Sequence, residues 1–212
     1  MSSAAGAACK DIRKVMLSPS VFLAHAKALE FGSVKFLIRR PVCKTFTIPA
    51  SNLDATEENQ FNGQLPTRIV IGCVGNEAFN GAYKKNSFNV KHMNLSQLKV
   101  YLDGQPLEMN YAHHQYINAY ATLFTGTGKW IRDEGNLISR QDFSRGYALY
   151  AFDLTADQCE GGHFNLLGHG TVRVDMKFAQ ALLNIINVIA FAKFENILEI
   201  DPSRNVLFDY KN

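Results

Sequence analysis

The stretch TVRVDMKF, residues Thr171–Phe178, alternates polar and apolar side chains without interruption. Its apolar members are Val172, Val174, Met176 and Phe178, and a Thr, an Arg, an Asp and a Lys stand between them. Successive side chains of a β-strand point to opposite faces of the sheet. The stretch therefore predicts a strand with one face in a core and the other in water.

A tight hairpin is predicted in QLKVYLDGQPL, residues 97–107. Leu98, Val100 and Leu102 alternate with other residues, and Asp103-Gly104 follows directly. The dipeptide Asp-Gly readily adopts the positive φ angles of a two-residue hairpin turn. We therefore expect two antiparallel strands joined at Asp103 and Gly104.

Several other short segments are predicted to be strands because they are rich in β-branched and aromatic residues. They are Lys10–Leu17, Val34–Ile38, Cys43–Ile48, Thr67–Val74, Tyr147–Leu154, Asn187–Phe194, Ile197–Ile200 and Asn205–Tyr210. The run AQALLNIINVIAFA, residues 179–192, could also form a buried helix, but a turn near Leu183 followed by a strand is favoured. Many short strands separated by turn residues are typical of a sandwich or barrel.

Two short helices are expected in loops of this β-protein. Ser18 can cap a helix that has Pro19 at its first position and ends at Gly32. The second helix, Gln115–Thr125, carries apolar residues at helical spacing and ends at Gly126 and Gly128.

The composition is that of one globular domain. The chain has 212 residues, 47% of them hydrophobic, and a net charge of +3, which predicts neither nucleic acid nor an acidic surface as a partner. No apolar run approaches the roughly 18 residues of a membrane helix. The start, MSSAAGAACK, lacks the apolar core of a secretory signal. We therefore expect an intracellular or virion protein without a membrane partner.

The four cysteines are predicted to be reduced, structural thiols. Cys9, Cys43, Cys73 and Cys159 are widely spaced and form no CxxC pair, so neither a zinc ribbon nor a disulfide framework is indicated. Cys73 lies inside the strand segment RIVIGCV, where a buried thiol is expected rather than a nucleophile.

The glycine-rich stretch FTGTGKW, residues 124–130, superficially resembles a phosphate-binding loop. Such a loop has a glycine five residues before the glycine that precedes lysine, and a Ser or Thr after the lysine. This chain has Leu123 and Trp130 at those positions, and the predicted helix precedes the loop. The glycines are therefore interpreted as the end of a helix, without a nucleotide site.

Cys159, His163 and His169 lie close together in QCEGGHFNLLGHG, residues 158–170. A zinc site needs three or four ligands in tetrahedral geometry, and these spacings match no metal motif closely. We interpret the segment as a solvated loop, and leave open whether these three residues ever bind a metal.

Short runs of like charge are interpreted as solvated loop surface. They are Arg39-Arg40, Glu57-Glu58, Lys84-Lys85 and Asp133-Glu134. The chain also has no GxSxG nucleophile elbow. We therefore assign no catalytic, cofactor-binding or metal residue, and expect a protein that is not an enzyme.

A family resemblance covers Ile12–Tyr210, nearly the whole chain. The segments that carry it are SPSVFLAHAKALE, VCKTFTIPA, LPTRIVIGCVGNEAFNGAYKKNSFNVKH, LFTGTGK, DEGNLISRQDF, GYALYAFDLTAD, GGHFNL and NVLFDY. Together they resemble invertebrate proteins that are similar to the double jelly-roll major capsid (hexon-type) proteins of Maverick/Polinton elements and adintoviruses.

The resemblance implies an all-β, antiparallel jelly-roll β-sandwich with the two short helices in loops. Residues 12–212 would form a single jelly-roll domain, equivalent to the C-terminal half of a double jelly roll, and residues 1–11 a replaced or disordered start. The implied function is structural. The chain would assemble into homotrimeric capsomers with itself, or with the N-terminal jelly-roll half of a full-length homologue.

The resemblance implies no cofactor, small-molecule substrate, nucleic acid or membrane as partner. The protein would lie in a virion if it is viral, and otherwise in the cytoplasm or nucleus. Whether the gene is viral, integrated or domesticated stays open. The alternative from another functional class is a jelly-roll module that binds carbohydrate or protein.

Overall fold

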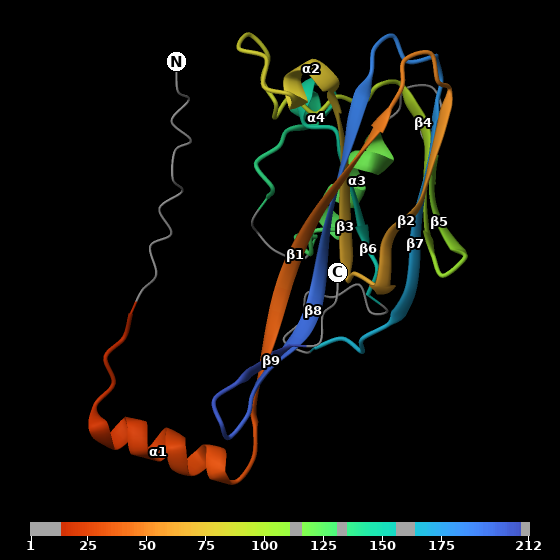
Figure 1. The fold of residues 1–212 in the computed structure, drawn as a ribbon. Coiled ribbons are helices and arrows are strands. Elements are labelled where there is room, and N and C mark those ends of the chain that lie inside the picture. Colours follow the sequence, from red (N-terminus) through yellow and green to blue (C-terminus); the bar gives the residue numbers. More distant parts are fainter. Residues whose placement is uncertain (1–13, 111–115, 131–134, 156–163, 209–212) are drawn as a thin grey trace, which may run out of the picture. The chain divides into compact units, whose positions relative to one another are not determined.

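The computed structural model describes residues 14–110, 116–130, 135–155 and 164–208 (Figure 1). The chain divides into two compact units. The larger unit comprises Leu37–Ile197 and Phe208–Asn212, and the smaller comprises Met1–Phe36 and Leu198–Leu207. Most of the β-sandwich belongs to the larger unit.

Two antiparallel sheets form the sandwich (Figure 1). Sheet one has the order β1-β8-β3-β6, with β9 paired to β8, and sheet two has the order β2-β7-β4-β5. The strands of sheet one are β1 (Val34–Ile48), β8 (Ile186–Ile200), β3 (Arg68–Gly75), β6 (Leu149–Asp153) and β9 (Val206–Phe208). The strands of sheet two are β2 (Asp54–Gln64), β7 (His169–Phe178), β4 (Leu95–Leu102) and β5 (Gln105–Asn110).

These strand orders define the fold as a jelly roll. From β1 to β8 the chain moves to the opposite sheet at every connection except the β4–β5 hairpin. Eight strands wound in this way form the two Greek keys of a jelly roll. The predicted fold class, an all-β antiparallel jelly-roll sandwich, is confirmed.

The strand that decided the sequence prediction lies in the middle of sheet two. The side chains of Val172, Val174, Met176 and Phe178 are buried, and the residues between them are partly or fully exposed. β7 pairs with β2 on one side and β4 on the other. Its apolar face meets the inner face of sheet one in a single core cluster.

The predicted hairpin is also confirmed. Leu102 is paired with Gln105, which leaves Asp103 and Gly104 as the two turn residues. Their φ angles are 48° and 84°. Both residues therefore adopt the left-handed conformation that this turn type requires.

In two cases, a pair of strands that were predicted separately forms one long strand. Val34–Ile38 and Cys43–Ile48 are joined in β1, which continues through Pro41. β1 lies at the edge of its sheet, where the missing N–H of a proline leaves no ladder position unfilled. The segments Asn187–Phe194 and Ile197–Ile200 are likewise joined in β8.

Strand β2 was missed, because its sequence DATEENQFNGQ is mostly polar. The interpretation of Glu57-Glu58 as loop residues is therefore wrong. A break in the β2–β7 register lies between Glu57 and Phe61, and Asn59 within it has a φ of 57°. The strand is thus bulged, which obscures any period-two pattern.

The other strand predictions differ mainly at their ends. Thr67–Val74 and Tyr147–Leu154 correspond to β3 and β6, and the turn near Leu183 precedes β8 as expected. Lys10–Leu17 lies partly outside the described residues, and its described part, residues 14–17, is not a strand. Only Val206–Phe208 of Asn205–Tyr210 is a described strand.

Four helices occur among the described residues. The two that were expected are α1 (Pro19–Glu30) and α3 (Ile117–Thr125), and the two that were missed are α2 (Asn76–Phe79) and α4 (Arg140–Gly146). Ser18 precedes α1, but its side chain makes no capping bond to the helix. Its hydroxyl lies 3.1 Å from that of Ser20 instead, so the predicted side-chain cap is wrong.

The smaller unit contains α1, the first residues of β1, the last residues of β8 and most of β9. None of the residues of α1 is buried. The guanidinium of Arg204 stacks over the ring of Phe22, 4.3 Å from its centre, and the hydroxyl of Ser33 donates a hydrogen bond to Glu199. Asn205 donates two bonds to Asp201, which lowers the pKa of that carboxyl. Polar and cation–π contacts and the β8–β9 pairing thus contribute to this unit.

We predict that Val174→Asp abolishes folding. Val174 is completely buried, and an unpaired buried carboxylate costs several kcal/mol against a total stability of about 5–15 kcal/mol. Asn62→Asp is the control, because it adds a carboxylate at an exposed position of the neighbouring strand β2. Circular dichroism of both variants is the measurement. A cooperatively folded Val174→Asp protein would contradict the assignment of the core.

Candidate functional site

The glycine-rich loop ends a helix, as predicted. α3 is capped at Gly126, and the loop follows the helix instead of preceding one. Gly128 has the expected left-handed φ of 69°, whereas Gly126 is right-handed, with a φ of −66°. The backbone N–H of Lys129 donates to the carbonyl of Phe124, and its Nζ donates to the carbonyl of Gly135. Lys129 is thus engaged with its own loop.

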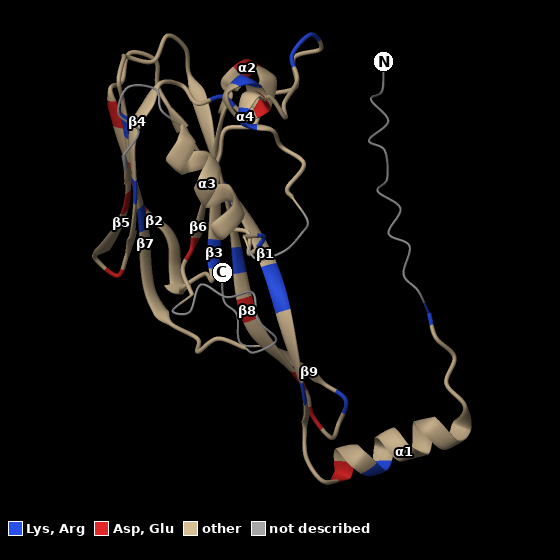
Figure 2. Cartoon of the chain, turned by 180° about the vertical axis from the view of Figure 1, so that it is seen from behind, with Lys and Arg blue, Asp and Glu red and all other residues tan. Residues whose placement is uncertain are grey.

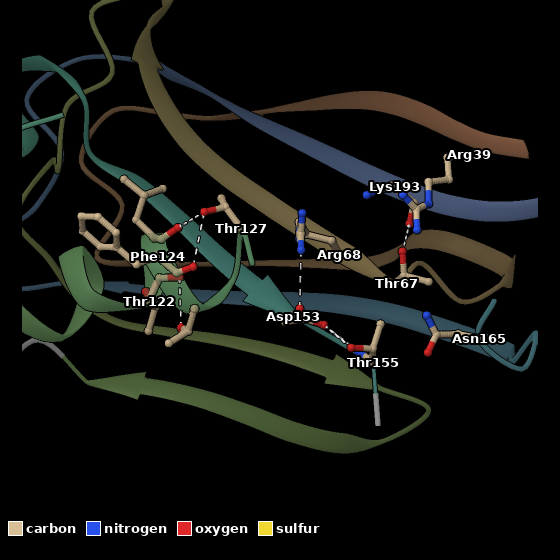
Figure 3. Close-up of polar contacts among 12 residues, drawn as sticks. Arg39, Thr67, Arg68, Thr122, Phe124, Thr127, Asp153, Thr155, Asn165 and Lys193 are labelled. Carbon is tan, nitrogen blue, oxygen red and sulfur yellow. Dashed lines mark hydrogen bonds and ion pairs between the residues drawn. The ribbon is translucent and has the colours of Figure 1, made fainter. Parts of the chain in front are cut away.

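Gly126 is required for a reason that the sequence did not indicate. A Cβ atom at this position would lie 2.7 Å from Cβ of Ala151 and 2.8 Å from its carbonyl carbon. Ala151 belongs to β6, so the missing side chain lets the end of α3 approach this strand. The hydroxyl of Thr127 then closes the helix end by donating to the carbonyls of Leu123 and Phe124 (Figure 3).

The buried thiol predicted at Cys73 is confirmed. Its side chain is inaccessible to solvent, and burial raises the pKa of the Cys73 thiol to about 12. It therefore remains a thiol at neutral pH and cannot act as a nucleophile. Cys43 is exposed on β1, whereas Cys9 and Cys159 lie outside the described residues.

The histidine-rich segment is described only in part. Cys159 and His163 lie outside the described residues, as do Asp133 and Glu134, and His169 is an exposed residue at the start of β7. Within residues 14–110, 116–130, 135–155 and 164–208, no three His, Cys, Asp or Glu side chains are grouped to hold a metal.

The interpretation of Arg39-Arg40 as loop charge is wrong, because both residues lie in β1 and point to opposite faces. Nε of Arg39 lies 3.4 Å from the carboxylate of Glu195, with side-chain exposures of 48% and 4%. The same carboxylate accepts hydrogen bonds from the backbone N–H and side-chain amide of Asn165, at 2.7 and 3.2 Å. Sequence analysis missed the buried Glu195, although a charge inside an apolar strand was a visible signal.

Arg40 joins a second group of polar residues on the inner side of the sheet. Its Nε donates to Oδ1 of Asn196 at 3.4 Å, and its guanidinium lies 5.0 Å from the ring centre of Phe194. Asn196 in turn donates to Oε1 of Gln64 at 2.7 Å, and Nε2 of Gln64 donates to the carbonyl of Glu195. Because Gln64 belongs to β2, this group links the two sheets.

Charged residues also line the part of sheet one formed by β3, β6 and β8 (Figure 3). Arg68 lies 3.6 Å from the carboxylate of Asp153, which accepts bonds from the backbone and hydroxyl of Thr155. Thr67 donates to the carbonyl of Lys193 at 3.1 Å. The charges of Arg68 and Asp153 are thus paired with each other.

Exposed apolar side chains occur on the same face as Arg39 and Glu195. Leu37 is two residues before Arg39 in β1, and Phe191 is four residues before Glu195 in β8, so the alternation of strands places all four on one face. Leu37 is 62% exposed and Phe191 44%. We call this surface the β1–β8 outer face.

The β1–β8 outer face borders an unpaired strand edge. Among the described residues, β1 pairs on one side only, with β8. An edge of this length that carries apolar residues is a site for contact with another chain unless it is protected. The outer face and this edge are the candidate functional surface.

The chain is similar to an uncharacterized protein of Caenorhabditis elegans designated F54H12.2. The two are 23% identical over 193 residues, which cover 87% of this chain and 46% of the nematode protein. The chain thus spans about half the length of this relative. No protein-family model matches the chain.

Similar solved structures include three viral assemblies or capsid proteins. A model of the PBCV-1 virus capsid is 12% identical, with a TM-score of 0.49, and the match covers 85% of this chain and 52% of that one. The Sputnik virophage structure is 10% identical, with a TM-score of 0.47, and the match covers 84% of this chain and 38% of that one. The mavirus major capsid protein is 8% identical, with a TM-score of 0.40, and the match covers 84% of this chain and 41% of that one.

No helix among the described residues is both long enough and apolar enough to cross a membrane.

We predict that Gly126→Ala destabilises the protein by about 1–3 kcal/mol, because overpacking against Ala151 forces a backbone shift. Gly75→Ala is the matched control, since a Cβ atom there meets nothing within 4 Å and its φ of −62° suits alanine. Urea unfolding measures both. Equal stability of the two variants would contradict the close approach of α3 to β6.

We also predict that Glu195→Ala destabilises more than Arg39→Ala. Loss of the buried carboxylate leaves the N–H groups of Asn165 without their acceptor, at a cost of about 1–3 kcal/mol. Arg39 is half exposed, and without it the Glu195 carboxylate keeps both hydrogen bonds from Asn165, so removal of the arginine should cost less. Thermal unfolding of both single variants and the double variant is the measurement. If Arg39→Ala destabilised more than Glu195→Ala, the ion pair would outweigh the hydrogen bonds from Asn165.

Proposed function

We propose that the chain is a structural, capsid-like protein that works by contact between jelly rolls and performs no catalysis. The β1–β8 outer face carries this proposal, because Leu37 and Phe191 are exposed beside an unpaired strand edge. Pro41 and the charged residues of β1 oppose direct strand pairing along that edge. An assembling subunit instead uses an exposed apolar surface for contact.

The strand order of the sandwich supports the same proposal. The resemblance over Ile12–Tyr210 implied a jelly roll of the major capsid type, and the sheets have the jelly-roll orders β1-β8-β3-β6 and β2-β7-β4-β5. Fold alone does not define function. The proposal therefore combines the fold with the exposed surface and with the residues that carry the resemblance.

The proposed assembly unit is a double jelly roll. Residues 12–212 would form its C-terminal half, and a second jelly roll would cover the β1–β8 outer face. That the chain spans about half of its nematode relative is consistent with a missing half. Three such units would close into a homotrimer, because cyclic symmetry satisfies every copy of an interface at once.

The proposed location follows from this role. The protein would be part of a virion if the gene is viral, and would stay within the cell if the gene is endogenous. The same proposal includes descent of this chain from a Maverick/Polinton capsid protein. The alternative is a jelly-roll module that binds carbohydrate or protein as a monomer.

We predict that the purified chain self-associates as its concentration rises. Leu37→Glu combined with Phe191→Glu should shift it toward the monomer, because the charges must be desolvated at the interface. The control is Leu137→Glu, which changes a fully exposed leucine that belongs to neither β1 nor β8. Multi-angle light scattering is the measurement.

A second arm adds the N-terminal jelly roll of a longer relative to the chain. We expect a species with three times the mass of the joined polypeptide. A strictly monomeric joined chain at high concentration, together with no effect of the two glutamates, would contradict the proposal and favour the monomeric binding module.

A further inference from the structure

An open cleft of about 860 Å³ lies beside α2, away from the residues of the β1–β8 outer face. Its residues come from the segments 75–94 and 180–186. Figure 1 shows α2 at one end of the sandwich, and Figure 2 shows basic residues in blue on the loop next to it. The volume is in the range of clefts that bind small organic molecules.

The walls of the cleft are fixed by backbone hydrogen bonds. The N–H of Asn76 donates to the carbonyl of Ile185 at 3.1 Å, and that of Ala179 donates to Asn94 at 2.8 Å. The N–H of Leu182 donates to the carbonyl of Asn52 at 3.1 Å. Because both walls are hydrogen-bonded to the sandwich, the cleft is preformed. Ligand binding would therefore cost little free energy for ordering the cleft.

The charge of the lining is predominantly positive. Lys84, Lys85 and Lys91 line the cleft together with a single acidic residue, Glu77. The ammonium of Lys85 is paired with the carboxylate of Glu77, so this acidic group is already neutralised. Lys84 and Lys91 have no ion-pair partner among the described residues. The expected charge at the cleft is therefore that of two unpaired ammonium groups.

Lys91 is held in place by the sandwich. Its backbone N–H donates to the carbonyl of Cys73 at 2.9 Å. Lys91 and Cys73 of β3 thereby form an isolated antiparallel β-bridge. Cys73 itself is completely buried. The attachment point of this lysine is thus rigid, although its side chain is exposed.

The amide side chains of the lining contribute further donors. Oδ1 of Asn86 accepts the N–H of Phe88 at 2.9 Å, and Oε1 of Gln180 accepts the amide of Asn94 at 3.4 Å. The side-chain NH2 groups of Asn86 and Gln180 can donate hydrogen bonds to a ligand. A site that presents ammonium and amide donors favours an anion that accepts several hydrogen bonds.

Part of the lining is apolar. Leu183 and Ile185 are exposed lining residues, and Met93 is partly buried. An inorganic ion would leave this apolar surface in contact with water. A ligand with an organic body as well as an anionic group would cover it.

We propose that this cleft binds an organic anion that carries a phosphate or sulfate ester. The ester group binds Lys84 and Lys91 and the amide donors, and the organic body covers Met93, Leu183 and Ile185. The proposal is independent of capsid-like assembly, which concerns the β1–β8 outer face and is measured without ligand.

Isothermal titration calorimetry of the full chain tests the proposal with two probes. ATP without magnesium represents phosphate esters, and a heparin-derived tetrasaccharide represents sulfate esters. We expect saturable binding of at least one probe, weakened by added salt. The double variant Lys84→Ala/Lys91→Ala should raise its Kd at least tenfold, whereas Lys84→Arg/Lys91→Arg should retain binding.

The matched control is Lys27→Ala/Lys177→Ala, which removes the same charge from exposed lysines outside the cleft. It should bind the probe as the unchanged chain does. NMR spectra should show the side-chain amide signals of Asn86 and Gln180 shifting on titration. Failure of both probes to bind, equal weakening in the control, or shifts confined to other residues would each overturn the proposal.

Discussion

Burial of one face of β7 is the constraint on which the rest of the sandwich depends. Val174 is aligned with Val100 of β4 and with Glu57 of β2. A register shift of one residue would move the apolar side chains of β7 from the core to the solvent-exposed face. Burial of this face therefore sets the register of both neighbouring strands. The inner face of sheet two then lies opposite Ile71 and Val188, which are inaccessible to solvent. The jelly-roll order follows from satisfying both sheets at once.

The polar group at Asn196 specifies where the apolar core ends. Phe61 and Phe194 contact each other edge to face, 5.7 Å apart, and beyond them Asn196 and Gln64 join the two sheets by a hydrogen bond. Buried amides cost free energy unless they are paired. An alternative alignment of β2 and β8 would leave both amides without partners. The apolar contacts therefore provide most of the stability, while this polar group favours one alignment of the sheets.

Sequence reasoning succeeded where the signal was local. The period of two in β7 and the turn Asp103-Gly104 depend only on neighbouring residues. By contrast, β2 is a strand because β7 pairs with it, and its polar sequence contains little evidence of that. Arg40 and Asn196, although in contact, are separated by 156 positions, so no pattern in one sequence could join them. The cap of α4, where Ser139 accepts the N–H of Asp142, was a local signal and could have been found.

Strand β8 takes part in each surface for which we propose a role. Ile186 at its start lines the cleft, and Phe191 lies on the outer face. Five residues of extended strand separate them by about 16 Å. Between them, Val188 and Ala190 are fully buried, and a packed core does not deform continuously. Sites this far apart that share no partner usually contribute additively to free energy. A ligand in the cleft and a second jelly roll on the outer face should therefore bind independently, unless one of them alters the backbone of β8.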